Sequence, residues 1–281
     1  MMTQFLPIYR GARLAAAICT CVLWAASPAH AETSTWATNE GGRMRLVVLP
    51  AAPDGTRQAA LQIEPAPGWI TYWREPGDSG IPPAVTISPD SPFQLEAMAF
   101  PVPKRIDDGP VHDIGYDAPV TLPLMLAGPP PGKDAKLTAS AFIGLCNNIC
   151  IPFQADFSLA LPAGDEKADD GAEIVSTARA LLPEQPSASF AVKEHALSPD
   201  MKQLRLVLAL PEESAEAPQI IVTGPSGYAF MDHSATEAAN GDLVVDMPIG
   251  KLPKNYKAAG KKWGVLVISG NRAMETTLAF D

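Results

Sequence analysis

The chain has 281 residues, of which 31 are acidic and 21 basic, and its formal net charge is −10. So acidic a chain is poorly suited to bind nucleic acid or an anionic membrane surface, and we expect neither as a partner. The sequence contains no recognisable motif of a serine hydrolase, a phosphate-binding glycine loop or a zinc-metalloprotease helix, so hydrolase functions are not favoured.

Residues 1–31 have the layout of a secretory signal peptide. Arg10 and Arg13 precede the apolar stretch Leu14–Ala26, and the run Ser27–Ala31 offers a small-residue cleavage site. The apolar stretch is shorter than the about 20 residues that a membrane span needs, and no later segment reaches that length. We therefore expect export to the periplasm, cleavage of the signal and no transmembrane span in the mature chain. An uncleaved anchor is the alternative.

Cleavage would change both the charge and the cysteine content. Two arginines would be lost, which takes the basic count from 21 to 19 and the net charge from −10 to −12. Cys19 and Cys21 would leave with the signal, so Cys146 and Cys150 would be the remaining thiols. Because the bacterial periplasm is kept oxidising, we expect this pair to form a disulfide.

Short apolar runs separated by turn residues and prolines predict an all-β domain over residues 32–163, a sandwich or a barrel. Its predicted strands are Arg43–Leu49, Gln58–Glu64, Trp69–Trp73, Ala84–Ile87, Phe93–Phe100, Val120–Leu126, Leu137–Leu145 and Ile151–Leu161. A charged stretch and the helical segment Ala172–Leu182 then predict a linker over residues 164–187.

Residues 188–281 are expected to form a second, smaller β-sandwich. Its predicted strands are Phe190–Lys193, Leu204–Leu210, Ile220–Thr223, Leu243–Asp246, Gly264–Ile268 and Glu275–Phe280. Asn240 and Gly241 predict a tight hairpin turn before Leu243. The second domain contains no cysteine, and we expect it to act as a spacer or a docking module.

The alternation of apolar residues places the cysteine pair at the tip of a hairpin. A three-residue loop pairs Leu145 with Ile151, which brings the apolar odd-numbered faces of both strands together. The same register sets Cys146 directly opposite Cys150 on the other face, where Cα atoms about 4.5–5.5 Å apart allow a disulfide. The loop residue Asn147, like Asn148, tolerates the positive φ that short hairpin loops often need.

The hairpin geometry alone leaves the role of this bond open. It favours a structural disulfide that pins the loop, although closing so small a loop stabilises the fold little. A redox-active couple is the first alternative, since a bond at a hairpin tip can be reached by an attacking thiolate. A Cu(I) site that uses both thiols and a methionine is a further alternative; Met231 lies beside His233, but no close Cys/His spacing supports it, and no metal site is predicted.

Three features of the sequence resemble a known family. They are the run Gly68–Gly80, which reads GWITYWREPGDSG, the run Val120–Leu124, and the hairpin Cys146–Cys150 followed by Pro152. Together they are similar to the periplasmic N-terminal domain of the DsbD group, which includes the copper-tolerance-associated ScsB proteins. The resemblance covers roughly residues 35–161.

The resemblance implies an immunoglobulin-like sandwich whose Cys146/Cys150 couple exchanges electrons without a bound cofactor, and Cys150 as the sulfur attacked. It makes a periplasmic thiol–disulfide exchange protein, a component of a protein-disulfide reductase system, the leading hypothesis. Electrons would come from a membrane-embedded thiol reductase and pass to periplasmic thioredoxin-like proteins. These are expected to be separate proteins, because this sequence has neither the membrane domain nor the thioredoxin-like domain of full-length members. A non-catalytic binding or scaffold protein with a structural disulfide, linked to copper stress, is the alternative.

The family also shields its cysteines with a cap loop, and by position the segment 107–112 is the candidate here. Its polar residues Asp107, Asp108 and His112 are then candidates for contact with a partner, with a solvated acidic turn as the alternative for the two aspartates. Three aromatic residues are further candidates for a docking surface, against the more frequent role of packing in a core or at an edge: Tyr72, Trp73 and Tyr116.

Overall fold

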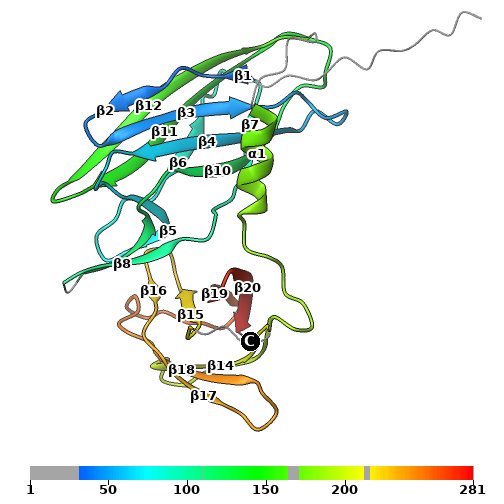
Figure 1. Ribbon diagram of the computed structural model, residues 1–281. Coiled ribbons are helices and arrows are strands. Elements are labelled where there is room, and N and C mark those ends of the chain that lie inside the picture. The colour runs from blue at the N-terminus through cyan, green and yellow to red at the C-terminus, as the bar shows by residue number, and fades with distance from the viewer. Residues whose placement is uncertain (1–31, 110, 164–170, 212–215, 281) are drawn as a thin grey trace, which may run out of the picture.

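The computed structural model describes residues 32–109, 111–163, 171–211 and 216–280 (Figure 1). The predicted signal peptide and residues 164–170 of the predicted linker lie outside these ranges. The described chain is almost entirely β-structure with one short helix, which confirms the predicted fold class. In this part of the chain no helix combines the length and the apolar character of a membrane span.

The first part of the described chain contains the strands β1 to β12. Their bounds are β1 (Glu32–Thr33), β2 (Ala37–Asn39), β3 (Gly42–Val48), β4 (Arg57–Pro65), β5 (Thr71–Gly77), β6 (Ala84–Ile87), β7 (Gln94–Met98), β8 (Lys104–Asp108), β9 (Val111–Tyr116), β10 (Val120–Ala127), β11 (Ala135–Cys146) and β12 (Cys150–Leu161). A sheet of order β1-β3-β4-β10-β7, with β2 paired to β3, faces a sheet of order β12-β11-β6. The two layers form an immunoglobulin-like sandwich.

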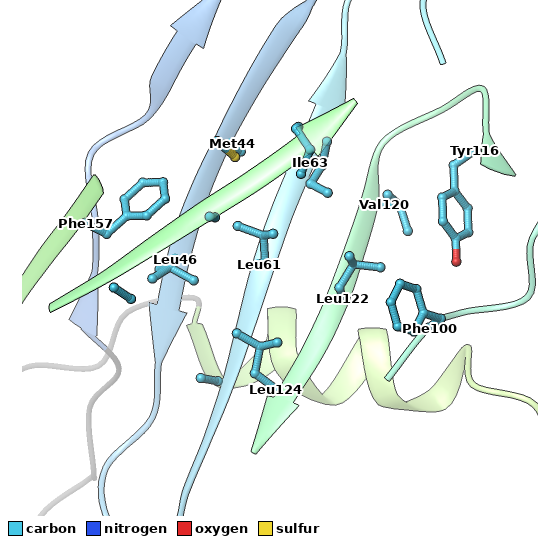
Figure 2. Packing of buried hydrophobic residues seen from close by; sticks show 14 of the residues in the cluster. Met44, Leu46, Leu61, Ile63, Phe100, Tyr116, Val120, Leu122, Leu124 and Phe157 are labelled. Atoms are coloured by element: carbon cyan, nitrogen blue, oxygen red, sulfur yellow. The ribbon is translucent and has the colours of Figure 1, made fainter. Parts of the chain in front are cut away.

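The core of this sandwich follows from strand alternation. Leu46 on β3, Leu61 on β4 and Leu122 on β10 point inward from one sheet, and Phe157 on β12 points inward from the other (Figure 2). Because side chains alternate between the faces of a strand, the intervening residues point the other way. The inward set is fully buried and supplies the hydrophobic free energy that holds the two layers together.

A third, small sheet of order β5-β9-β8 lies at one end of the sandwich (Figure 1). Sequence periodicity predicted part of β5 but neither β8 nor β9. Both missed strands are short, and Lys104, Arg105, Asp107 and Asp108 give β8 a charged sequence without an alternating apolar pattern. The segment expected to be a cap loop is therefore the connected end of a β8–β9 hairpin.

The helix α1 (Gly171–Ala180) packs against the outer face of the larger sheet. Val175 is buried there between Val47 of β3 and Ala60 of β4, with Ile174 partly buried beside them. Val47 and Ala60 point outward because their neighbours in sequence point into the core. The helix within the predicted linker is thus a packed element of the first sandwich rather than a bare connection.

The chain after the helix forms a second sandwich around its own core, which contains Trp263 and Phe190. Its strands are β13 (Ala191–Leu197), β14 (Gln203–Ala209), β15 (Gln219–Thr223), β16 (Ala229–Phe230), β17 (Ser234–Glu237), β18 (Leu243–Pro248), β19 (Lys261–Ser269) and β20 (Arg272–Phe280). They form sheets of order β13-β14-β18-β17 and β16-β15-β19-β20. The predicted turn at Asn240 and Gly241 connects β17 to β18, with Gly241 at φ 82°.

The two sandwiches share an apolar boundary. Ile221 of β15 and Leu266 of β19 are buried with the core of the first sandwich, whereas their sequence neighbours point into the second core. The outer face of one sheet of the second sandwich therefore packs toward β5 and the first sandwich, as the arrangement of strands in Figure 1 shows.

Truncation of Val175 tests whether the helix is an integral part of the first sandwich. Val175→Ala removes buried apolar surface and should lower the free energy of unfolding by about 2 kcal/mol, measured by urea denaturation. The neighbouring exposed position provides the control, since Ser176→Ala should change stability by no more than about 0.5 kcal/mol. Equal effects of the two substitutions would contradict the docked helix.

Candidate functional site

The register of the β11–β12 hairpin confirms the predicted pairing. Leu145 pairs with Ile151, and Cys146 pairs directly with Cys150 at the end of the ladder. The two cysteines form a disulfide with an S–S distance of 2.01 Å and a Cα–Cα distance of 4.1 Å. Positive φ outside glycine occurs in the described residues only at Met201 and Asn255, so the loop asparagines do not use that conformation.

The two sulfurs of this bond have different environments. Cys146 is only 3% exposed, whereas Cys150 and the three loop residues before it are exposed. The sequence pattern correctly placed both cysteines off the core face, because neither belongs to the hydrophobic core of the sandwich. It did not predict that one of them is covered. An incoming thiolate can therefore approach Cys150 but not Cys146.

Residues at the start of β5 pin the hairpin tip from one side. The N–H of Ile70 donates to the carbonyl of Cys146 at 2.8 Å, and the N–H of Cys146 donates back to Ile70 at 3.0 Å. The Thr71 hydroxyl donates to the carbonyl of Gly144 at 3.0 Å. These bonds form an isolated bridge at the hairpin tip and hold Cys146 against the beginning of β5.

Tyr72 and a segment after β5 cover the non-core face of the hairpin beside the disulfide. A Cβ atom on Gly144 would lie 2.7 Å from the Cβ of Ile81 and 3.2 Å from a ring carbon of Tyr72. A Cβ on Gly80 would lie 2.3 Å from the Tyr72 ring, so the backbone of this segment rests directly on the tyrosine. Glycine at both positions permits this close approach.

The hydroxyl of buried Tyr72 is the polar group that reaches the disulfide. It lies 3.6 Å from Sγ of Cys150 and donates to Oδ2 of Asp113 at 3.4 Å. Asp113 is itself buried and accepts hydrogen bonds from the N–H and the hydroxyl of Ser79. Burial, and then the charge of Asp113, raise the pKa of Tyr72 far above its usual range, so this hydroxyl keeps its proton.

The next residues of β5 connect the site to the second sandwich. Trp73 is buried in the first core, and the Arg74 guanidinium stacks 3.9 Å from its ring centroid while pairing with Glu275 of β20. Glu75 accepts a hydrogen bond of 2.8 Å from the N–H of Gly227. The motif that suggested the family thus contacts the disulfide, the core and the second sandwich in turn.

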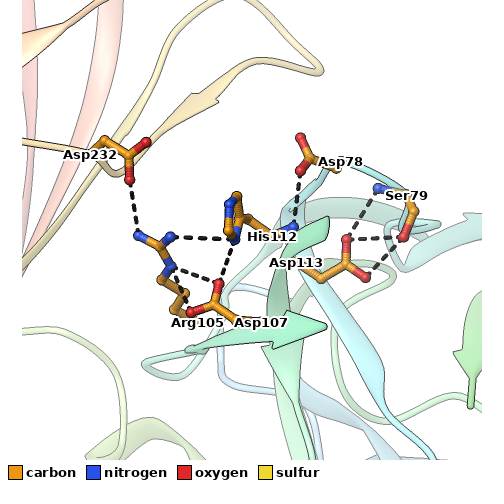
Figure 3. Close-up of polar contacts among 7 residues, drawn as sticks. All are labelled: Asp78, Ser79, Arg105, Asp107, His112, Asp113 and Asp232. Carbon is orange, nitrogen blue, oxygen red and sulfur yellow. Dashed lines mark hydrogen bonds and ion pairs between the residues drawn. The ribbon is translucent and has the colours of Figure 1, made fainter. Parts of the chain in front are cut away.

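The segment predicted as the cap lies at the other edge of the small sheet. Nδ1 of His112 is 2.7 Å from Oδ1 of Asp107, and Arg105 donates to the same carboxylate at 2.8 Å (Figure 3). Hydrogen bonds from Arg105 and then His112 lower the pKa of Asp107. Of Asp108 only the backbone pairing with Val111 is described. The capping role of this segment remains a prediction.

Figure 3 also shows that two adjacent residues of β9, His112 and Asp113, hold the segment that follows β5 at Asp78 and Ser79. The N–H of His112 donates to Asp78 at 2.9 Å, and Asp113 holds Ser79. On the other side, Arg105 reaches Asp232 of the second sandwich at 3.3 Å. The described contacts of the predicted cap residues are therefore with each other, with Arg105 of β8 and with Asp78, and it is Arg105 that contacts the second sandwich.

The three aromatic residues considered for a docking surface are packed inside the protein rather than exposed on its surface. Tyr72, Trp73 and Tyr116 are all buried, the alternative favoured for them from the sequence. The Tyr116 hydroxyl donates to the carbonyl of Pro101 at 2.8 Å, and burial raises its pKa. Tyr116 also lines a groove of about 990 Å³ between α1, the start of β10 and the β19–β20 turn. Only Tyr72 touches the disulfide.

Comparison with known proteins identifies the family of the first domain. Residues 44–162 match the family described as thiol:disulfide interchange protein DsbD, N-terminal. These residues therefore form a domain that belongs to the DsbD N-terminal family, which confirms the resemblance of the sequence motifs. No curated protein matches the chain.

Solved structures extend the likeness to both sandwiches. The N-terminal periplasmic domain of ScsB from Proteus mirabilis aligns with 89% of this chain and 99% of its own, at a TM-score of 0.69 and 23% identity. The two proteins therefore share the fold. A marsupial T cell receptor aligns with 87% of this chain and 99% of its own at a TM-score of 0.22 and 8% identity, which is too distant to carry an argument.

Several residues of the site were not found from the sequence. Asp113, which holds the Tyr72 hydroxyl, and Ile81 lie in stretches that had no recognisable chemical pattern, whereas Ser79, which bonds to Asp113, lies within the family motif but had no role assigned to it. Gly80 lies within the family motif, but its role depends on the tyrosine ring beneath it. The signal that would have found these residues is their spatial proximity to Cys150, which local sequence does not contain.

The stability of a protein without the disulfide tests the structural alternative. Because the bond closes a very short ring, replacing both cysteines by alanine should lower the free energy of unfolding by no more than about 2 kcal/mol. Urea denaturation of Cys146→Ala/Cys150→Ala, compared with oxidised and dithiothreitol-reduced wild type, measures the loss. A variant that fails to fold would mean that the bond serves as a structural staple.

Glu75 predicts a pH dependence at the boundary between the sandwiches. Burial raises the folded-state pKa of Glu75, against the opposing effects of the Gly227 N–H and Arg74. Because the folded-state pKa is raised, ionisation of Glu75 destabilises the folded protein. This penalty is absent below the unfolded pKa of about 4.3, grows as the pH rises toward the folded-state pKa, and is complete above it. Glu75→Gln keeps a hydrogen-bond acceptor without charge, so it should raise Tm at pH 7.

The same Glu75→Gln variant should have the Tm of the wild type at about pH 3, well below the unfolded value, where the carboxyl group is neutral in both states. Glu194→Gln, at an exposed position of β13, is the control and should change Tm little at either pH. A Glu75→Gln variant less stable than wild type at pH 7 would contradict the predicted penalty.

Proposed function

We propose that the protein is a periplasmic thiol–disulfide exchange protein that uses Cys146 and Cys150 as its redox couple. The observation that carries the proposal is the asymmetry of the disulfide, with Cys150 exposed and Cys146 buried. Membership of the first domain in the DsbD N-terminal family supports the class of reaction. The likeness of both sandwiches to the periplasmic domain of a ScsB protein supports the compartment.

The proposed reaction proceeds through a mixed disulfide. A thiolate of the reductant attacks Sγ of Cys150, a bond forms between these two sulfurs, and the bond to Cys146 breaks with the electron pair on Cys146. Because a buried thiolate is unfavourable, Cys146 takes up a proton as it leaves. A second thiolate of the reductant then displaces Cys150, which releases the reduced dithiol and the oxidised reductant.

The reverse sequence delivers the electrons. Cys150 attacks a disulfide of an oxidised partner, and Cys146 then attacks the resulting mixed disulfide and restores the intramolecular bond. We propose a membrane-embedded thiol reductase as the source of electrons and oxidised thioredoxin-like proteins as their recipients. In this scheme the single proton of the Tyr72 hydroxyl, donated to Asp113 in the disulfide form, turns to the sulfur of Cys150 as negative charge develops there, and Ser79 keeps Asp113 in place.

The reduction potential of the couple separates this function from a structural disulfide. Equilibration with dithiothreitol or glutathione redox buffers should give a potential above about −300 mV, because structural disulfides of exported proteins lie below that value. A potential well below −300 mV, with resistance to reduction by thioredoxin, would support the alternative of a binding or scaffold protein.

Removal of the Tyr72 hydroxyl tests its role beside the reactive sulfur. Tyr72→Phe should slow attack of the reduced protein on 5,5′-dithiobis(2-nitrobenzoate) by about fivefold, which corresponds to about 1 kcal/mol for one hydrogen bond. Tyr116→Phe, which removes another buried hydroxyl of the first domain, is the matched control and should leave the rate near that of wild type. Equal rates for wild type and Tyr72→Phe would exclude this role.

A further inference from the structure

The loop between the two cysteines presents an unusual apolar side chain. Ile149 is 63% exposed, and Leu181 at 59% is the other large hydrophobic residue exposed to this degree in the described part of the chain. The carbonyl of Ile149 accepts a hydrogen bond of 3.0 Å from the N–H of Asn147, which closes the loop and leaves the side chain outside. Ile149 directly precedes the exposed Cys150.

The segments at the hairpin tip beside Ile149 are uncharged in sequence, and Asp113, whose carboxylate contacts Tyr72, is buried. Three segments meet there without a single Asp, Glu, Lys or Arg, although 19% of the chain is charged: Pro65–Trp73, Ser79–Pro89 and Leu137–Ala155. Their contacts at the tip join Ile70 to Cys146, Tyr72 to Cys150, and Ile81 to Gly144.

Acidic residues adjoin these uncharged segments in the sequence. Asp78 precedes the segment that covers Tyr72, and Glu40 precedes Gly41, whose backbone packs on Trp69 and Leu145. A partner that covers Cys150 therefore loses little hydration of charged groups at the centre, where the side chain it meets is apolar. Exposed apolar surface of this kind, bordered by polar residues, is typical of protein interaction sites.

We propose that Ile149 is the docking residue for the redox partner, and that the partner presents an apolar, uncharged cleft beside its own reactive cysteine. This inference rests on the proposed function, because it assigns the surface that recognises the partner of the Cys146/Cys150 couple. Ile149 inserts into the cleft and brings the partner sulfur in line with Cys150. Contact with Ile149 therefore accelerates attack by a protein thiol, whereas a small thiol makes no such contact.

Rate constants with a protein thiol and a small thiol test this proposal. Oxidised wild type, Ile149→Ser and Leu181→Ser are each reduced by reduced thioredoxin, as the protein probe, and by dithiothreitol. Ile149→Ser should lower the rate with thioredoxin tenfold or more, the lower end of what burial of an isoleucine side chain contributes. It should change the rate with dithiothreitol less than twofold. Leu181→Ser is the matched control and should change neither rate, and Ile149→Val should restore most of the rate with thioredoxin.

The outcomes separate the docking surface from the redox function. Equal effects of Ile149→Ser on both rates, or no effect on either, would overturn the docking role while leaving the redox couple intact. A wild-type protein that reacts no faster with thioredoxin than with dithiothreitol would also overturn it, since contacts between the proteins would then contribute nothing. A disulfide that resists both reagents would contradict the proposed function itself.

Discussion

The backbone hydrogen bonds between Ile70 and Cys146 are the constraint on which the rest of the site depends. They join the start of β5 to the tip of the β11–β12 hairpin, and a strand that begins there must place Tyr72 over the non-core face of the hairpin. Two residues later the same strand reaches the second sandwich through Arg74. The disulfide, the first core and the second sandwich are thus positioned by one short strand.

This arrangement produces the difference between the two sulfurs. A hairpin tip by itself would leave both cysteines open to solvent, whereas β5 and the segment at Ile81 cover one side of the tip and bury Cys146. The exposed Cys150 then lies beside the Tyr72 hydroxyl, which stays protonated because it is buried beside Asp113. A thiolate therefore has one sulfur to attack and a defined leaving group behind it.

Much of the fold, and the disulfide itself, could be predicted from the sequence because period-2 alternation is strong in residues 137–161. That pattern gave the hairpin, its register and the pairing of Cys146 with Cys150. The proximity of Tyr72 to Cys150 could not be predicted, because these residues are 78 positions apart and no local pattern relates them. The charged β8–β9 hairpin was missed for a different reason, since short strands of the small sheet lack an alternating apolar face.

The identity of the cysteine that forms the mixed disulfide tests the central claim most directly. Oxidised protein is treated with reduced glutathione, the products are blocked with N-ethylmaleimide, and the two cysteines are examined by mass spectrometry. If exposure of Cys150 and burial of Cys146 govern the reaction, glutathione is found on Cys150 and the maleimide on Cys146. Glutathione on Cys146, or no adduct at all, would contradict the account.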